Sequence, residues 1–258
     1  MKCCICGTVR NCGQYLDKIF KNMEIISVLF EDYVIILYYD ESNDNTLKKL
    51  KEYQQKNKKL ILHINTEPLL KYRTHRIAKG RNKCLEIMRQ NYDDYDYFIM
   101  MDCDDRCSYN IKIRLLEYYL KRKDWDSLSF KHPAGYYDSW ALSKRPFVLS
   151  CHHFKDNAIG IRFINKIIQK TPINGLITCL SAFNGFAIYR KKKFENCNYD
   201  GHFRLDYIPQ SLIEENLKYA GTMDLSQDKE DCEHRFFHIN AVVNNNARIR
   251  ISPLSLFV

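Results

Sequence analysis

Three aspartates follow a short apolar run near the middle of the chain. The run from Tyr97 to Met101 is bounded by charged residues, a pattern that predicts a strand buried on both faces of a sheet. Ligands of open α/β sheets bind beyond the carboxyl ends of such strands, so Asp102, Asp104 and Asp105 are expected to face a crevice. Dense carboxylate oxygens suit Mg²⁺ or Mn²⁺ that also holds a substrate phosphate. The alternative is an Asp-rich turn that caps the next helix.

Acidic and histidine side chains also gather late in the chain, in the segment 228–238 (DKEDCEHRFFH). Together with the apolar residues after it, this segment predicts a helix. On that helix Asp231, His234 and His238 share one face, which could present a metal ligand or a base. The two histidines match the spacing of a zinc-binding helix, but Arg235 stands where a His-Glu-x-x-His motif needs its glutamate. The alternative is a solvated acidic turn that complements the helix dipole.

Aromatic side chains and one carboxylate gather in the segment 132–142 (HPAGYYDSWAL). Tyr137, Asp138 and Trp140 could stack on a sugar and hydrogen-bond to it, whereas the alternative is an aromatic corner of the core. Further along, Asn184 and Gly185 interrupt an apolar run. They predict an extended segment with a glycine at a point of close approach.

The elements that must position these side chains alternate between strand and helix over residues 1–105, as in a doubly wound unit. The predicted strands are Lys2–Thr8, Tyr33–Tyr39, Leu60–Ile64 and Tyr97–Met101, and the predicted helices are Tyr15–Leu29, Thr46–Gln55 and Arg76–Arg89. Later in the chain, strands are expected at Trp125–Phe130 and at Ile249–Ile251, the second ending at Pro253.

Four parallel strands would place the segments 8–11, 40–42 and 102–105 along one edge of the sheet. There a carboxylate can hydrogen-bond a ribose or a base, cationic side chains can approach a diphosphate, and a metal ion can neutralise the leaving group. The sequence contains neither a P-loop motif nor a Gly-x-Gly-x-x-Gly turn, which argues against P-loop and Rossmann cofactor chemistry. The pattern therefore predicts a nucleoside-diphosphate site.

Composition narrows the class of protein. The chain has 258 residues, 45% of them hydrophobic and 13% aromatic, enough for one large core or two fused half-domains. Eleven cysteines at irregular spacings, several of them in apolar runs, indicate buried thiols in a reducing compartment. Cys103 and Cys107 lack a second pair, which argues against a zinc site. The first apolar run is too short for a signal peptide and no run approaches ~18 apolar residues, so we expect a cytoplasmic protein without a membrane span.

The net charge of +9 raises the possibility of a nucleic-acid partner. Its distribution favours solvated surfaces instead, because the lysines cluster in surface-helix contexts at 48–51 and 56–59 and after a strand at 191–193. We therefore expect no nucleic-acid partner, although the excess charge could favour an anionic nucleotide or an acidic acceptor.

The order of these motifs resembles the A-type (GT-A) fold of nucleotide-sugar-dependent glycosyltransferases, with local similarity to capsule mannosyltransferases and to family-two enzymes. The resemblance rests on the segments 8–11, 40–46, 76–82 and 102–105, and on a Tyr-Asp-x-Trp-Ala element at 137–141. In such enzymes the D-x-D carboxylates hold a divalent cation against the sugar nucleotide. An acidic residue at the start of a late helix often acts as general base, and some of these enzymes add a late histidine as a metal ligand.

The resemblance implies an α/β fold with an open, mostly parallel, Rossmann-like sheet of GT-A type and helices on both faces. Residues 1–258 would form one domain, with a nucleotide-binding half at 1–105 and an acceptor- and sugar-binding half at 106–258. The implied nucleotide contacts are Thr8, Arg10, Asn11, Asp40, Glu41, Asp44, Arg76, Arg81, Asn82 and Asp102. The implied sugar contacts are Tyr137, Asp138, Trp140, Asn184 and Gly185. The implied metal ligands are Asp102, Asp104, Asp105, His234 and His238, and the implied base is Glu233 or Asp231.

We therefore predict a metal-dependent hexosyltransferase that moves a sugar from a nucleotide sugar, a UDP-sugar before a GDP-sugar, to a hydroxyl of a glycan or protein, with inversion. A sugar nucleotidyltransferase is the first alternative, although only fragments of its Gly-rich loop occur at 6–11. A non-catalytic glycan- or RNA-binding protein is the second. The sequence leaves a homo-oligomer open.

Overall fold

The computed structural model of the chain describes residues 1–221 and 229–258. Within these residues, eight strands form one sheet in the order β3-β2-β1-β4-β7-β5-β8-β6. Four neighbouring strands run parallel: β1 (Lys2–Val9), β2 (Asp32–Tyr39), β3 (Leu60–Ile64) and β4 (Tyr97–Met101). The other four are β5 (Ser127–Lys131), β6 (Ile177–Cys179), β7 (Phe186–Arg190) and β8 (Ile249–Ser255). Of these, β7 lies antiparallel between β4 and β5, and β6 is antiparallel to β8.

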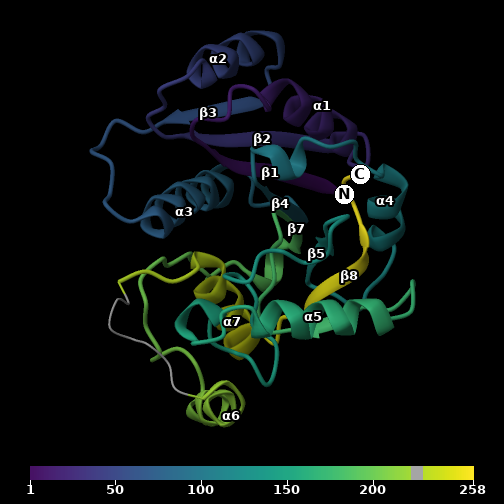
Figure 1. The fold of residues 1–258 in the computed structure, drawn as a ribbon. Helices are drawn as coiled ribbons and strands as arrows, with labels where there is room; N and C mark the ends of the chain where they lie inside the picture. Colours follow the sequence, from purple (N-terminus) through teal and green to yellow (C-terminus); the bar gives the residue numbers. More distant parts are fainter. Residues whose placement is uncertain (222–228) are drawn as a thin grey trace.

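The helices cover both faces of the sheet (Figure 1). One face packs against α1 (Leu16–Ser27), α2 (Thr46–Lys56) and α4 (Ile113–Leu120). The other packs against α3 (Arg73–Asn91), α5 (Ile159–Lys170) and α7 (Glu233–Asn245). A further helix, α6 (Gln210–Ala220), lies beyond α7 and packs against a third, smaller apolar cluster. The predicted class is confirmed: the fold is α/β, with a mostly parallel sheet and helices on both faces.

The central strands are uninterrupted apolar runs because helices cover both faces of the sheet. In β1, Cys3 and Ile5 enter one hydrophobic core while Cys4 and Cys6 enter the other, and all four are fully buried. Side chains alternate between the faces of a strand, so a strand covered on both faces needs apolar residues at every position.

The predicted elements of residues 1–105 are confirmed within a few residues at each end. The second half departs further from prediction. Residue 228 lies outside the described residues, and the late helix begins at Glu233. Strand β8 continues through Pro253, which the sequence placed at its end. The pairing of β8 with β5 shifts register between Phe130 and Lys131, so Pro253 lies at an irregularity where its missing N–H costs little.

The reversal at β7 brings the second half of the chain to the acidic cluster. Met101 pairs with Phe186, and the N–H of Asp102 donates to the carbonyl of Gly185 at 2.8 Å. The residues before β7 therefore lie beside the carboxyl end of β4. None of the described helices is long and apolar enough to cross a membrane.

Candidate active site

Two adjoining pockets lie at the carboxyl ends of β1, β2 and β4. The larger, about 310 Å³, is lined by the loop 8–12, by Tyr38 and Asp40 at the end of β2, and by the start of α3. The smaller, about 150 Å³, lies between the start of α3, the segment 137–140 and the start of α7. Both are lined by Arg73, Ile77, Asp102 and Asp104. The two spaces therefore meet at the acidic cluster.

Hydrogen bonds between two loops shape the wall of the larger pocket. Asn11, at φ 52°, donates its N–H to Ser42 Oγ at 3.0 Å and accepts the N–H of Asn43 at 2.7 Å. Asparagine is one of the residues that tolerate this left-handed conformation. Arg10 Nε donates to the carbonyl of Glu41 at 3.0 Å. Of the nucleotide contacts expected here, Thr8, Arg10, Asn11 and Asp40 line the larger pocket, whereas Glu41 and Asp44 do not.

Asp44 instead joins the two loops. Its carboxylate accepts the N–H of Gly13 at 2.9 Å and the N–H of Thr46, the first residue of α2, at 3.0 Å. Burial opposes ionisation, but these hydrogen bonds hold the pKa of Asp44 below its usual range. The oxygens of Asp44 are therefore engaged by the backbone, as at a helix N-terminus.

Four carboxyl groups, those of Asp102, Asp104, Asp138 and Glu233, line the smaller pocket. Burial raises the pKa of each of them. The pKa of Asp102 rises to about 8, because burial and the negative charge of Asp104 outweigh the attraction of Arg81. Carboxyl groups crowded in this way ionise together only when positive charge is added.

Arg81 supplies positive charge behind the carboxyl groups. Its guanidinium donates to Asp102 Oδ1 at 2.9 Å, to Glu233 Oε1 and to His234 Nε2, and it is only 3% exposed. The rings of Phe183 and Tyr199 lie 4.7 and 5.7 Å from it, within cation–π range. Arg81 lines the smaller pocket and not the larger one. Through its contacts with Asp102 and Glu233 it links the acidic turn after β4 to the first residue of α7.

His234 and Asn82 are also held from within the protein. Burial and the charge of Arg81 lower the pKa of His234 well below its usual range, so the ring is neutral. Its Nδ1 is buried and has no hydrogen-bond partner among the described residues. Asn82 exchanges two hydrogen bonds with the backbone of Tyr199, at 2.7 and 2.8 Å, and lines neither pocket.

Asn184 and Gly185 shape the aromatic wall of the smaller pocket. Asn184, at φ 60°, accepts the N–H groups of Tyr137 and Asp138 at 3.0 and 3.2 Å. Gly185 has φ 86°, and a Cβ there would lie 2.6 Å from the hydroxyl oxygen of Tyr137. The hydroxyl of Tyr137 and the indole N–H of Trp140 are buried and lack hydrogen-bond partners within the described part of the chain. A polar ligand would satisfy both groups.

The acidic turn fits a metal that is shared with a substrate. Among the described residues, no three His, Cys, Asp or Glu side chains form a preformed metal site. Mg²⁺ and similar ions often take one or two carboxylates and complete their shell with substrate phosphates and water. Asp102 and Asp104, at the junction of the pockets, match that donor set.

Of the other predicted ligands, His234 lines the smaller pocket, whereas Asp105 and His238 line neither pocket. Asp105 lies outside both, with Arg106 Nε at 3.6 Å. His238 is fully buried, and its ring nitrogens lie 3.0 Å from Ser181 Oγ and 3.1 Å from Tyr189 Oη. Burial lowers the pKa of His238 to about 3, so it is a neutral core residue.

Asp231, the second predicted base, does not line the smaller pocket. It pairs with Arg235 Nε at 3.1 Å and accepts the N–H of Cys232 at 2.7 Å. Burial opposes its ionisation, yet Arg235 keeps the pKa of Asp231 below its usual range. Glu233, by contrast, lines the pocket.

Two arginines of the pockets were not predicted. Arg73 begins α3 and lines both pockets, and Arg106 lies 4.4 Å from the ring of Tyr137 in the smaller one. The sequence did contain a signal for Arg106, because a cation directly after an acidic turn is a candidate partner for the same ligand. Arg76, which was predicted, lines the larger pocket and donates to the carbonyl of Leu70 at 2.7 Å.

Comparison with known proteins adds a family match. The model of the family described as Glycosyl transferase family 2 matches residues 4–197. No curated protein matches the chain.

Solved structures resemble the fold at low sequence identity. Residues 1–349 of TarS from S. aureus align with a TM-score of 0.53 and 16% identity, over 100% of this chain and 60% of that one. The same protein in complex with UDP-GlcNAc aligns at 0.49 and 16%, over 100% and 58%. The mannosyltransferase PcManGT from Pyrobaculum calidifontis, in complex with GDP-Man and Mn²⁺, aligns at 0.45 and 14%, over 77% and 47%. The chain thus spans about 60% of the structure of TarS residues 1–349.

Proposed function

The chain belongs to glycosyl transferase family 2, and we propose that it transfers a sugar, with inversion, from a metal-bound nucleotide sugar to a hydroxyl of a glycan or protein. Membership of this family does not support either alternative, a sugar nucleotidyltransferase or a non-catalytic binding protein. One observation carries the proposal. The larger and smaller pockets meet at Asp102 and Asp104, and Glu233 lines the smaller pocket.

The larger pocket is assigned to the nucleotide. Asp40 would hydrogen-bond the ribose or the base, while Arg73 and Arg76 would approach the diphosphate. Asp102 and Asp104 would hold Mn²⁺ or Mg²⁺, which supplies the positive charge that stabilises the departing diphosphate. We take UDP-sugars as the first donor class and GDP-sugars as the second.

The smaller pocket is assigned to the transferred sugar. The Tyr137 hydroxyl and the Trp140 indole N–H, which are buried without protein partners in the described chain, would hydrogen-bond the sugar. Asp138 would add a third contact on the same wall.

Glu233 is assigned as the general base. Arg81 contacts its Oε1, so Oε2 is the oxygen we assign to the acceptor hydroxyl. Because burial raises the pKa of Glu233, its carboxylate holds a proton more strongly than an exposed glutamate does, which suits proton abstraction near neutral pH.

A donor screen tests this function. The purified chain is incubated with a panel of UDP- and GDP-sugars, in Mn²⁺ and in EDTA, and release of the nucleotide is measured. We expect release from one donor class in Mn²⁺ and none in EDTA. Equal release in both conditions would contradict the metal role, and no release from any donor would contradict the function. NMR of the first product reports whether the anomeric configuration has inverted.

A further inference from the structure

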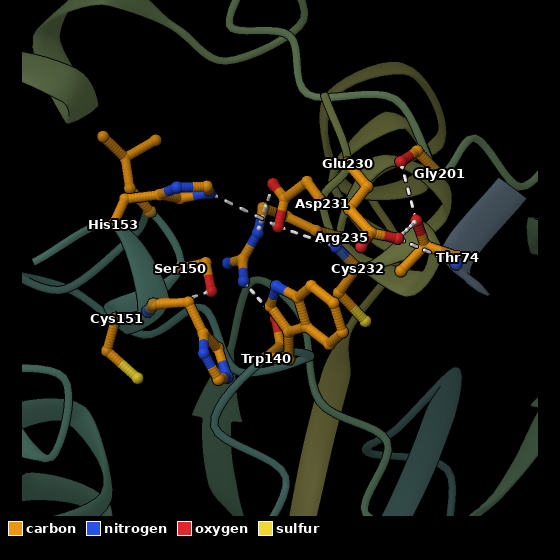
Figure 2. Close-up of polar contacts among 12 residues, drawn as sticks. Thr74, Trp140, Ser150, Cys151, His153, Gly201, Glu230, Asp231, Cys232 and Arg235 are labelled. Atoms are coloured by element: carbon orange, nitrogen blue, oxygen red, sulfur yellow. Dashed lines mark hydrogen bonds and ion pairs between the residues drawn. The ribbon is translucent and has the colours of Figure 1, made fainter. Parts of the chain in front are cut away.

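Arg235, in the first turn of α7, is a fully buried charge that reaches across to another segment. Its Nε donates to Asp231 Oδ2 at 3.1 Å (Figure 2). Its Nη1 donates to the carbonyls of Leu142 and Val148, both at 2.9 Å, and its Nη2 donates to the carbonyl of Trp140. A planar guanidinium can serve several fixed acceptors at once, which a lysine ammonium on a flexible chain cannot.

Asp231 balances that charge and is itself fixed. It accepts the N–H of Cys232, and its own N–H donates to the carbonyl of Gly201 at 2.9 Å. His153 Nε2 lies 3.9 Å from Asp231 Oδ1. Figure 2 draws this contact as a dashed line. A buried charge of either sign is costly without its partner, so the pair acts as one unit.

The segment 140–148, to which Arg235 donates its hydrogen bonds, continues one wall of the smaller pocket. Asp138 and Trp140 line that pocket, and Asp138 Oδ1 accepts the N–H of Ala141 at 3.1 Å. Asn184 anchors the start of this wall, at Tyr137 and Asp138. Arg235 anchors its far end, at the carbonyl of Trp140 and the turn that follows. On the same helix, two residues before Arg235, stands Glu233.

We propose that the Asp231–Arg235 pair is a positioning unit that fixes the wall carrying Asp138 and Trp140 relative to Glu233. It sets how the transferred sugar lies against the base and leaves nucleotide binding in the larger pocket unchanged. This inference rests on the proposed function, since it takes the smaller pocket as the sugar site. A misplacement of about 1 Å at a reacting centre can cost ~10²-fold in rate, so a loosened wall should lower turnover strongly.

The test compares Arg235→Lys with a matched change elsewhere. Arg190 also spans loops through its guanidinium, donating to the carbonyls of Trp125 and Arg122 at 3.0 and 2.6 Å and to Tyr97 Oη at 2.8 Å. Tyr97 is the first residue of β4, at the end of the strand opposite Asp102, so Arg190→Lys removes a similar set of contacts away from the pockets.

We expect Arg235→Lys to keep the Kd for UDP in Mn²⁺ within ~2-fold and to lower kcat at least ~10-fold. Hydrogen exchange over residues 138–148 should quicken in Arg235→Lys. Arg190→Lys should lower Tm while kcat and this exchange stay normal. Asp231→Asn, which removes the charge at nearly constant size, should match Arg235→Lys in direction.

Wild-type kcat in Arg235→Lys, or a parallel loss in Arg190→Lys, would overturn the proposal. So would the failure of both Arg235→Lys and Asp231→Asn to fold when Arg190→Lys folds, because the pair would then be a fold requirement. A wild-type chain that turns over no nucleotide sugar contradicts the proposed function instead. UDP affinity and hydrogen exchange still decide in that case whether the pair orders this wall.

Discussion

Asp104 is the residue at which metal and nucleotide binding should be linked, since it lines both pockets at their junction. Asp104→Ala removes a hard oxygen ligand, so we expect it to abolish the Mn²⁺ dependence of UDP binding and to weaken binding at least ~10-fold in Mn²⁺. Titration calorimetry in Mn²⁺ and in EDTA measures both effects.

Asp105 provides the control for Asp104. It is the neighbouring carboxylate, it lies outside both pockets, and its side chain is 49% exposed. Asp105→Asn should therefore leave the Mn²⁺ dependence of UDP binding intact. If the wild-type chain bound UDP equally well in EDTA and in Mn²⁺, the metal-bridging role of Asp104 would be wrong.

Glu233→Gln should lower kcat at least ~10²-fold while the donor KM stays nearly unchanged, because the amide cannot accept the acceptor proton. Glu24→Gln is the control, since Glu24 hydrogen-bonds Tyr53 on the other face of the sheet. A folded Glu233→Gln protein with wild-type kcat would remove this residue as the base.

The pH profile gives a second signature of Glu233. Only the ionised carboxylate can act as base, and burial raises its pKa above the ordinary value of 4.5. Activity of the wild-type chain should therefore rise with pH over a range above that value, and Glu233→Gln should flatten this limb. An unchanged limb in the variant would assign the titration to another group.

Residue types predicted Asp102 and Asp104 as pocket residues, and the resemblance to glycosyltransferases added Glu233. The sequence was not enough to separate Glu233 from Asp231, because two acids two positions apart near the start of a helix give the same signal. Arg235, four residues further on, pairs with Asp231, whereas Glu233 contacts Arg81, which lies 152 positions away in the chain. A sequence shows no such tertiary partner.

At the level of elements, the turn before β7 should be the most sensitive to small changes. Gly185→Ala would strain a backbone at φ 86° and place a methyl group 2.6 Å from the Tyr137 hydroxyl oxygen. We expect a lower Tm and a donor KM raised severalfold, measured by calorimetry and by donor titration.

Gly221→Ala is the control for this prediction, because it strains the backbone without crowding a side chain in the described part of the chain. Gly221 follows α6 with φ 72°, and a Cβ there would meet no atom of the described residues within 4 Å. Gly221→Ala should therefore cost about 1 kcal/mol of stability through backbone strain and leave the donor KM unchanged. Equal kinetic effects in the two variants would show that the approach of Gly185 to Tyr137 has no role in donor binding.

Predictability differed between elements for physical reasons. Strands β1, β2 and β4 were predicted because burial on both faces demands an unbroken apolar run. The short β6 and the helices α4, α5 and α6 were not predicted. In α4 the signal was present, since Leu116, Tyr119 and Leu120 recur at helical spacing on its buried face. The three residues of β6 carry no periodicity, and their place at the sheet edge depends on pairing with β8.

At the level of the whole molecule, residues 1–105 and 106–258 share their two large cores. One core joins Cys3 and Ile5 of β1 to Trp125 and Leu128 of the second half. In the other, the rings of Phe98 in β4 and Tyr189 in β7 stack at 4.4 Å between centroids. We therefore propose that residues 1–258 unfold as one domain, because both of the large cores draw side chains from both halves.

Phe237→Ala tests this proposal from the second half. Phe237 is fully buried in α7, where its ring packs against Phe194 and Tyr199, so its removal should cost about 3–5 kcal/mol of unfolding free energy. If the halves unfold together, hydrogen exchange in β2 of the first half should quicken as much as exchange in β5, and calorimetry should show one transition at a lower Tm. Strands β1, β4 and β7 separate β2 from β5 in the sheet, so a change in β2 has to pass through the shared core. Exchange that quickened only in the second half, or a second calorimetric transition, would instead show two independently stable halves.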